Sequence, residues 1–211
     1  MEVTAEERER LEELYNMEKE LKKRGYTFIA GVDEAGRGPL AGPVVAGAAI
    51  LALDTQIIDL KDSKKLSEKK RKKVYDQIKK HAIAFSYDVV DEKYIDKHNI
   101  LNATLFGMRR AVEKLHIKPD YILVDALTIP GMSIPQQGIK RGDDLCACIA
   151  AASIIAKVER DELMKQYDKA YPGYFFSKNK GYGTKQHVEA IRKNGYCPIH
   201  RHSFSVKGLN V

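Results

Sequence analysis

The segment at residues 121–125, with the sequence YILVD, constrains the fold of this chain more than any other feature. It is a short and nearly continuous apolar run, which is typical of a strand covered on both faces. In α/β proteins such strands carry ligand-binding residues at their carboxyl ends. We therefore predict an α/β domain in which Asp125, the last residue of the run, lies at a binding edge of the sheet.

Hydrophobic periodicity predicts the other elements. We expect further strands at residues 26–33, 42–53, 82–90 and 133–140, and helices at residues 4–24, 67–80, 99–115, 143–171 and 184–193. Ser67 is the expected N-cap of the second helix. The residues expected to face inward are Leu11, Leu14, Tyr15 and Leu21 in the first helix and Leu101, Leu105, Met108 and Val112 in the third.

The order of these elements implies a three-layer α/β domain around a mixed five-stranded sheet. With no long linker in the chain, we expect an N-terminal helical extension at residues 1–24 and one domain at residues 25–211. The helical C-terminal region, from about residue 172 to residue 211, is expected to pack against that domain.

The N-terminus, the apolar stretches and the cysteines indicate where in the cell the protein is located. The N-terminus is acidic and polar, and no apolar stretch approaches the ~20 residues that span a bilayer. The three cysteines are odd in number and lack the spacing of zinc or redox pairs, so we expect free thiols. We predict a cytoplasmic protein with no membrane partner.

The net charge of +7 is unevenly distributed. Residues 61–73 hold eight basic and two acidic residues, and residues 178–207 hold seven Lys and Arg against the single acid Glu189. Such runs fit a nucleic-acid partner, although a solvated surface explains them too.

Four acidic positions are candidates for chemistry. Asp33 and Glu34 end a predicted strand directly before Gly36-Arg37-Gly38, and both serve one site only if the strand ends or bulges there. Asp143 precedes the long helix, where Asp144 is equally well spaced. Alone, Asp33 could cap a turn while Glu34 is solvated at the surface, and Asp143 or Asp144 could cap the long helix. Together with Asp125, they form an all-oxygen ligand set suited to Mg²⁺ or Mn²⁺.

Seven segments are informative together: GVDEAGRGPLAGPVVAGA, KDSKKLSEKKRKKVYDQI, NILNATLFGMRRAV, YILVDA, GDDLCACIAAASIIAKVERDE, KGYGTKQH and HRHSF. With these segments, which stand in the family's order, the chain resembles the bacterial ribonuclease HII family from about residue 25 to residue 206. The resemblance implies a ribonuclease H-like fold and an endonuclease that acts on the RNA strand of RNA–DNA hybrids and on ribonucleotides embedded in duplex DNA. It also implies Mg²⁺ or Mn²⁺, two ions with substrate bound, and unidentified replication or repair proteins as partners.

The resemblance also implies roles for individual residues. Asp33, Glu34 and Asp125 match the first three catalytic, metal-binding acids, and counting six residues back from Ile149 makes Asp143 the fourth. This chain has Arg141 where the family usually has lysine before the glycine. The expected substrate contacts are the Gly36, Arg37 and Gly38 loop at the 2′-hydroxyl, Tyr182 at the RNA-to-DNA junction, and Lys64 and Lys65 at phosphates.

Two alternatives stay open. The chain could be another nuclease of the same fold, such as a ribonuclease HIII, or a hybrid-binding module without catalysis. The intact Gly36–Gly38 loop and Tyr182 argue against the first, and the presence of all four acids argues against the second. His187, His200 and His202 are interpreted as surface or packing residues, and Lys157, Arg160 and Asp161 as an intrahelical group.

Overall fold

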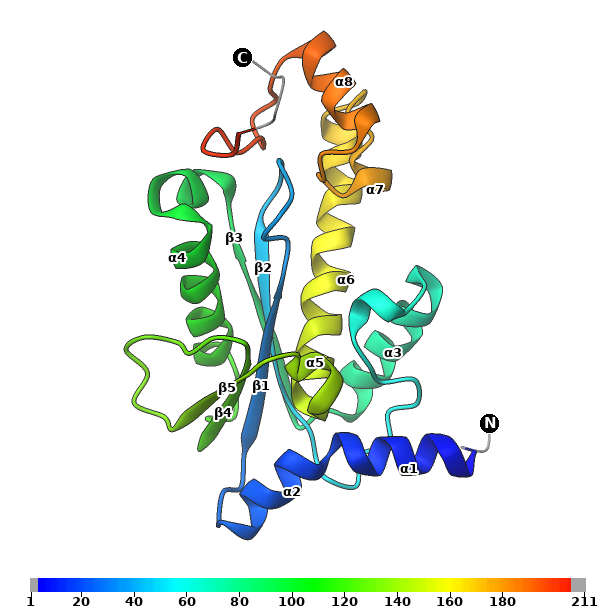
Figure 1. Ribbon diagram of the computed structural model, residues 1–211, viewed down its shortest axis with the longest axis vertical. Coiled ribbons are helices and arrows are strands. Elements are labelled where there is room, and N and C mark those ends of the chain that lie inside the picture. The colour runs from blue at the N-terminus through cyan, green and yellow to red at the C-terminus, as the bar shows by residue number, and fades with distance from the viewer. Residues whose placement is uncertain (1–3, 206–211) are drawn as a thin grey trace.

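The computed structural model describes residues 4–205 and contains a mixed five-stranded sheet of order β3-β2-β1-β4-β5 (Figure 1). The strands are β1 (Ile29–Ala35), β2 (Val44–Ile50), β3 (Ala84–Val90), β4 (Tyr121–Asp125) and β5 (Gln136–Ile139). β2 runs antiparallel to β1 and β3, while β4 runs parallel to β1 and β5. The predicted mixed sheet and the buried β4 are confirmed, and β5 is an edge strand.

Helices cover both faces of the sheet, as the three-layer prediction requires. Figure 1 shows α4 (Glu92–Glu113) on one face and α6 (Ala147–Ala170) with α3 (Glu68–His81) on the other. Two shorter helices, α7 (Phe176–Asn179) and α8 (Lys185–Asn194), lie at the far end of α6. Ser67 caps α3 as predicted, its hydroxyl accepting from the Lys70 N–H group.

The long helix α6 lies very close to the sheet because two glycines face it. A Cβ atom at Gly31 of β1 would lie 2.1 Å from the carbonyl carbon of Cys148, and one at Gly47 of β2 would lie 2.4 Å from the Ala152 carbonyl oxygen. The facing part of the helix is made of small residues, since Ala150, Ala151 and Ala152 are all fully buried. Only glycine on the strands and alanine on the helix permit this separation.

The N-terminal extension differs from the predicted single helix. It forms α1 (Ala5–Leu14) and α2 (Asn16–Lys23), which meet at a bend at Tyr15. The Tyr15 hydroxyl donates to the Thr55 carbonyl oxygen at 2.8 Å, so the bend docks the extension on the domain. All four residues predicted to face inward are buried: Leu11, Leu14, Tyr15 and Leu21.

The predicted helix at residues 143–171 is two helices. The short α5 (Gly142–Leu145) ends at Cys146, whose backbone is extended, and α6 starts afresh at Ala147. α6 has no local side-chain cap. Instead the buried Glu18 carboxylate of α2 accepts the Cys148 N–H at 2.8 Å. A cap supplied from about 130 residues away cannot be read from the local sequence.

The helix predicted from Asn99 starts earlier. α4 begins after Asp91, which accepts the Tyr94 N–H group, and it kinks at Asn99, where φ is 65°. Met108 and Val112 are buried as predicted and Leu105 is half-buried, whereas Leu101 was wrongly placed inward and is 43% exposed. Leu101 follows the kink closely, so the face it presents is not the one that a straight helix would give it.

Three further expectations concern the whole chain. Cys146, Cys148 and Cys197 are free thiols, as predicted. Within residues 4–205, no helix is both long enough and apolar enough to cross a membrane. Residues 1–3 of the predicted extension and 206–211 of the predicted domain, including the end of the basic run at residues 178–207, lie outside the described residues.

Because α6 packs so closely on the sheet, we expect alanine substitutions at Gly31 and at Gly107 to differ strongly in their effect on stability. Gly31→Ala should lower the free energy of unfolding by about 3 kcal/mol, because the new methyl group meets helix backbone that cannot move aside. Gly107→Ala, in α4, meets a Val90 methyl group at 3.1 Å and gains helix propensity, so it should change stability by less than about 1 kcal/mol. Urea unfolding of both variants measures the difference. Equal effects would show that α6 does not depend on this contact.

Candidate active site

Asp33 and Asp125 lie at the same level on neighbouring parallel strands. The register pairs Val32 of β1 with Val124 of β4, so the next residue of each strand is an aspartate. Both side chains fall on the face that α6 covers, because Gly31, two residues before Asp33 in β1, meets that helix. Asp33 is only 3% exposed, and its carboxylate accepts the Glu34 N–H at 2.7 Å.

Glu34 joins this pair although it follows Asp33 directly. β1 keeps its register with β2 through Ala35, so the strand does not bulge there, but its pairing with β4 stops at Val32. Glu34 therefore overhangs the end of β4. Its pKa is raised by burial and by the charge of Asp125, while the Arg37 guanidinium, 3.4 Å away, acts in the opposite direction. A solvated surface role for Glu34 is wrong, since its side chain is only 12% exposed.

Asp143 reaches the same place from α5. The Gly142 N–H donates to the Asp125 carboxylate at 2.8 Å, which fixes α5 against the end of β4. Asp143 is 6% exposed, and its pKa is raised by burial and by the charges of Asp62 and Asp125. Asp144 turns outward and pairs with Lys65 and Arg141. The structure thus brings Asp143, not Asp144, into the group of buried acids.

The chemistry of this group fits a divalent cation. Burial and the neighbouring charges of Glu34 and Asp125 raise the pKa of Asp33 well above its usual range, with the Ser153 hydroxyl counteracting part of the effect. Acids gathered in this way need a cation or protons to compensate their charge. In residues 4–205, no three His, Cys, Asp or Glu side chains converge closely enough to enclose an ion by themselves. An open group of carboxylates suits Mg²⁺, which keeps water and substrate phosphate among its ligands.

The turn with Lys64 and Lys65 lies beside the acids. The Lys64 ammonium is 3.8 Å from the Asp143 carboxylate, and although burial lowers its pKa, the charges of Asp62 and Asp33 raise it overall. Asp62 is a buried acid that sequence reasoning missed, and its carboxylate accepts the Lys64 N–H. Its position directly before Ser-Lys-Lys was the available signal.

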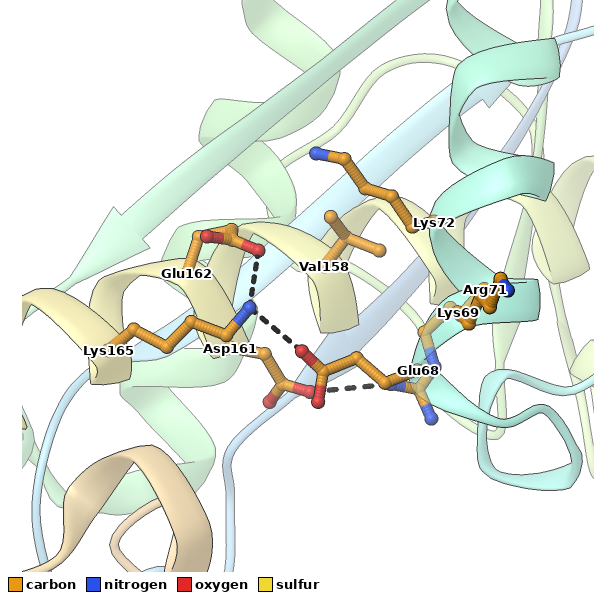
Figure 2. Close-up of a pocket in the computed structure, with 8 residues that line it drawn as sticks. All are labelled: Glu68, Lys69, Arg71, Lys72, Val158, Asp161, Glu162 and Lys165. Carbon is orange, nitrogen blue, oxygen red and sulfur yellow. Dashed lines mark hydrogen bonds and ion pairs between the residues drawn. The ribbon is translucent and has the colours of Figure 1, made fainter.

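Buried contacts between α3 and α6 hold this turn in place. Arg71 of α3 donates to the Ser63 and Leu66 carbonyl oxygens, both at 2.8 Å, and pairs with Asp161 of α6. Figure 2 shows this pair beside the Lys165 ammonium, which bridges Glu68 and Glu162 at 2.8 and 2.9 Å. These groups line a cleft of about 400 Å³ between the two helices. Its three acids, Glu68, Asp161 and Glu162, all form ion pairs with Arg71 or Lys165.

The Gly36–Gly38 loop and Tyr182 lie side by side. A Cβ atom at Gly38 would be 3.7 Å from the Tyr182 ring, which is 46% exposed. The Leu40 N–H donates to the Gly181 carbonyl oxygen at 2.8 Å and joins the two segments. The structure thus unites residues that are about 145 positions apart in the sequence.

Two buried arginines, Arg160 and Arg201, fix these loops, a role that the sequence did not reveal for either. Arg201 donates to the carbonyl oxygens of Gly36, Arg37 and Gly42 at 2.6–2.9 Å, and Arg160 donates to those of Pro43, Lys180 and Ala41 at 2.9–3.2 Å. Each is 1% exposed. Burial lowers the pKa of Arg160 to about 10 and of Arg201 to about 9, so both stay charged at neutral pH.

The remaining candidates are structural. His187 and His200 are buried with their Nε2 atoms 3.2 Å apart, which confirms packing roles, and His202 is exposed. Lys157 and Asp161 form the expected intrahelical pair at 2.7 Å, whereas Arg160 was wrongly grouped with them. Arg160 points from α6 to the loops because a planar guanidinium can serve three carbonyl oxygens at once.

Comparison with known proteins agrees with this architecture. A Pyrococcus horikoshii ribonuclease H2 structure is 28% identical, with a TM-score of 0.71, covering 84% of this chain and 94% of that one. The Archaeoglobus fulgidus ribonuclease HII, solved with PCNA, is 23% identical, with a TM-score of 0.70, covering 85% and 96%. The fold is therefore that of the ribonuclease H-like nucleases.

Sequence comparison gives the particular family. The Ribonuclease HII family model matches residues 30–207. A ribonuclease HII of Desulfitobacterium hafniense (strain DSM 10664 / DCB-2) is 54% identical over 199 residues, which cover 94% of this chain and 76% of the relative. The chain belongs to the ribonuclease HII family and is an endoribonuclease with ribonuclease H activity, dependent on a divalent metal as that family is.

Because each buried arginine binds three carbonyl oxygens, we expect even a lysine substitution there to lower the stability strongly. Arg201→Lys keeps the charge, but a single ammonium cannot reach three carbonyl oxygens, so we expect a loss of about 2–4 kcal/mol of stability. Arg109→Lys, in an exposed pair with Glu113 on α4, should cost less than about 0.5 kcal/mol. Thermal unfolding of both variants tests this. A melting temperature for Arg201→Lys equal to that of Arg109→Lys would contradict it.

Proposed function

We propose that this protein hydrolyses the RNA strand of RNA–DNA hybrids and incises duplex DNA on the 5′ side of an embedded ribonucleotide, leaving 3′-hydroxyl and 5′-phosphate ends. The observation that carries the proposal is the open group of four neighbouring acids, together with the Gly36–Gly38 loop and Tyr182, in a ribonuclease HII chain. A cytoplasmic location and a replication or repair protein as partner belong to the same proposal, since the substrate is duplex nucleic acid.

In this proposal Asp33, Glu34, Asp125 and Asp143 hold Mg²⁺ or Mn²⁺, two ions with substrate bound. Such ions supply Lewis-acid stabilisation of the phosphate oxygens and a reactive water. The chain's own part is to hold the scissile phosphate in line. Lys64, beside Asp143, offers a charge for a phosphate oxygen, and the open carboxylates leave room for one.

Sugar recognition is assigned to the Gly36–Gly38 loop. Arg201 binds the carbonyl oxygens of Gly36 and Arg37, which fixes the loop's orientation. Within residues 4–205, no protein group accepts from the N–H groups of Arg37 or Gly38, so these donors are free for a ligand. The 2′-hydroxyl is what distinguishes RNA from DNA at one position, and it can accept such a bond. Selectivity should therefore depend on the sugar rather than the base.

The direct test uses a DNA duplex with one ribonucleotide, incubated with and without Mg²⁺ or Mn²⁺. We expect a single cut on the 5′ side of the ribonucleotide, only with metal, and none in an all-DNA duplex. The end groups are read by ligation and by phosphatase treatment. Binding without cleavage in either metal would instead indicate a hybrid-binding module.

Asp143→Asn should reduce the cleavage rate by at least about 100-fold, because it removes charge that the metals need. Duplex affinity measured without divalent metal should change little. Asp144→Asn is the matched comparison, one residue along the same short helix. The assignment of the fourth acid is wrong if Asp144→Asn abolishes cleavage while Asp143→Asn is mild.

Tyr182 should decide whether a single embedded ribonucleotide is cut. Its exposed ring lies beside Gly38, where it can stack on a sugar or base at the junction. Tyr182→Phe should lower the rate by about three- to tenfold through loss of the hydroxyl, and Tyr182→Ala by about 10- to 100-fold through loss of stacking. The loss should be smaller on a long hybrid.

Melting temperatures of both Tyr182 variants are needed as a control. A purely packing role makes Tyr182→Phe silent and Tyr182→Ala unstable. A folded Tyr182→Ala that cuts the single-ribonucleotide duplex at the wild-type rate removes the tyrosine from junction recognition.

A further inference from the structure

A second cleft opens next to the acids, between the N-terminal extension and α5. It has a volume of about 410 Å³, and four cationic side chains from three separate segments surround it: Arg10 of α1, Lys61 and Lys65 of the turn before α3, and Arg141 before α5. The other lining residues are Glu13, Leu14, Asp144 and Leu145. Figure 1 shows that α1 passes below α5, so the extension forms one wall.

Asp144 joins two of these cations. Its carboxylate lies 2.5 Å from the Lys65 ammonium and 3.1 Å from the Arg141 guanidinium. Both cationic side chains are well exposed, at 52% and 80%, whereas the Asp144 side chain is 19% exposed. One carboxylate with a cation on each of its oxygens has the geometry in which two non-bridging phosphate oxygens are bound.

Hydrogen bonds fix the wall of the cleft that α1 and the segment before α3 form, and this wall carries Lys61. Arg10 donates to the Leu60 carbonyl oxygen at 2.8 Å and pairs with Glu7, whose carboxylate also accepts the Asp59 N–H. These contacts hold Lys61, the next residue after Leu60, at the edge of the cleft. Within residues 4–205, no carboxylate lies within ion-pair distance of the Lys61 ammonium, although its charge acts on Glu7 from further away.

We propose that this cleft binds a backbone phosphate diester of the nucleic-acid duplex and that Asp144 fills the phosphate position in the free protein. The inference rests on the proposed function, and it adds a subsite that includes the N-terminal extension. The cleft adjoins Asp143 through Asp144, so a strand whose scissile phosphate lies at the acids has a neighbouring phosphate within reach of Lys65 and Arg141. Because exposed ion pairs are weak, an arriving phosphate can displace the carboxylate.

A permanent bridge is the competing explanation. In that case Asp144 ties the turn at residues 61–65 to α5, and its removal loosens both segments. The two explanations predict opposite changes in affinity. A phosphate mimic competes with substrate, so its neutralisation strengthens binding, whereas loss of a structural bridge weakens it.

The test measures duplex affinity by fluorescence anisotropy without divalent metal, over a series of salt concentrations. Asp144→Asn should tighten binding of an RNA–DNA hybrid about three- to tenfold and steepen the log–log salt slope by up to about 0.9, because the freed cations meet phosphate without displacing a carboxylate. Glu113→Gln is the control. It removes one negative charge from an exposed pair on α4, across the sheet, and should leave the slope unchanged.

A double variant tests whether the gain in affinity of Asp144→Asn depends on Lys65. In a Lys65→Gln background, Asp144→Asn should gain much less affinity than in the wild type, because one of its two cations is gone. Lys61→Gln should flatten the slope by about 0.9 if Lys61 also meets phosphate. An unchanged or weaker affinity for Asp144→Asn, or a gain equal to that of Glu113→Gln, overturns the subsite.

The wild-type protein separates this failure from a failure of the proposed function. Wild type that neither binds the hybrid nor cuts it with Mg²⁺ or Mn²⁺ refutes the proposed function itself. Wild type that binds and cuts, while Asp144→Asn shows no gain over Glu113→Gln, refutes only the subsite. Melting temperatures of all variants exclude a loss of folding as the cause.

Discussion

The close approach of α6 to the sheet determines the rest of the structure. Gly31 and Gly47 leave no side chain between the strands and the helix backbone, so α6 lies against β1 and β2 along its alanine-rich first half. That position places the Ser153 hydroxyl beside Asp33 and brings α5, just before α6, to the end of β4. A larger separation would leave the acids of the sheet and Asp143 apart, since side chains of this length cannot span an additional layer.

The acids and the two buried arginines near the site differ in how their charges are compensated. Asp33 and Asp143 are buried and Glu34 is partly buried, and burial raises the pKa of each carboxyl group although Arg37 lies near Glu34 and Lys64 lies near Asp143. Arg160 and Arg201 are also buried, yet their N–H groups are satisfied by six carbonyl oxygens of the loops. Uncompensated charge thus stays where a cation can bind, while fully hydrogen-bonded charge provides rigidity.

The N-terminal extension supports two elements of the domain. Glu18 caps α6 through the Cys148 N–H, and burial raises the pKa of its carboxyl group. Arg10 of the same extension supports the segment that leads into the lysine turn. Residues that carry no chemical signature in the sequence therefore position two elements that border the acids.

The sequence by itself determined the layers and the order of the strands along the chain, because burial imposes a periodicity that can be read locally, as in YILVD. It also named Asp33, Glu34 and Asp125 as candidates, because they stand at the ends of predicted strands. The resemblance to ribonuclease HII singled out Asp143 over Asp144, which spacing alone left open. Tertiary structure alone decided what depends on distant partners. It ended α5 at Cys146 and capped α6 with Glu18, it joined Gly38 to Tyr182, and it directed Arg160 and Arg201 to loop carbonyl oxygens. Such contacts join residues up to about 165 positions apart, and no local pattern records which carbonyl oxygen a buried arginine will meet.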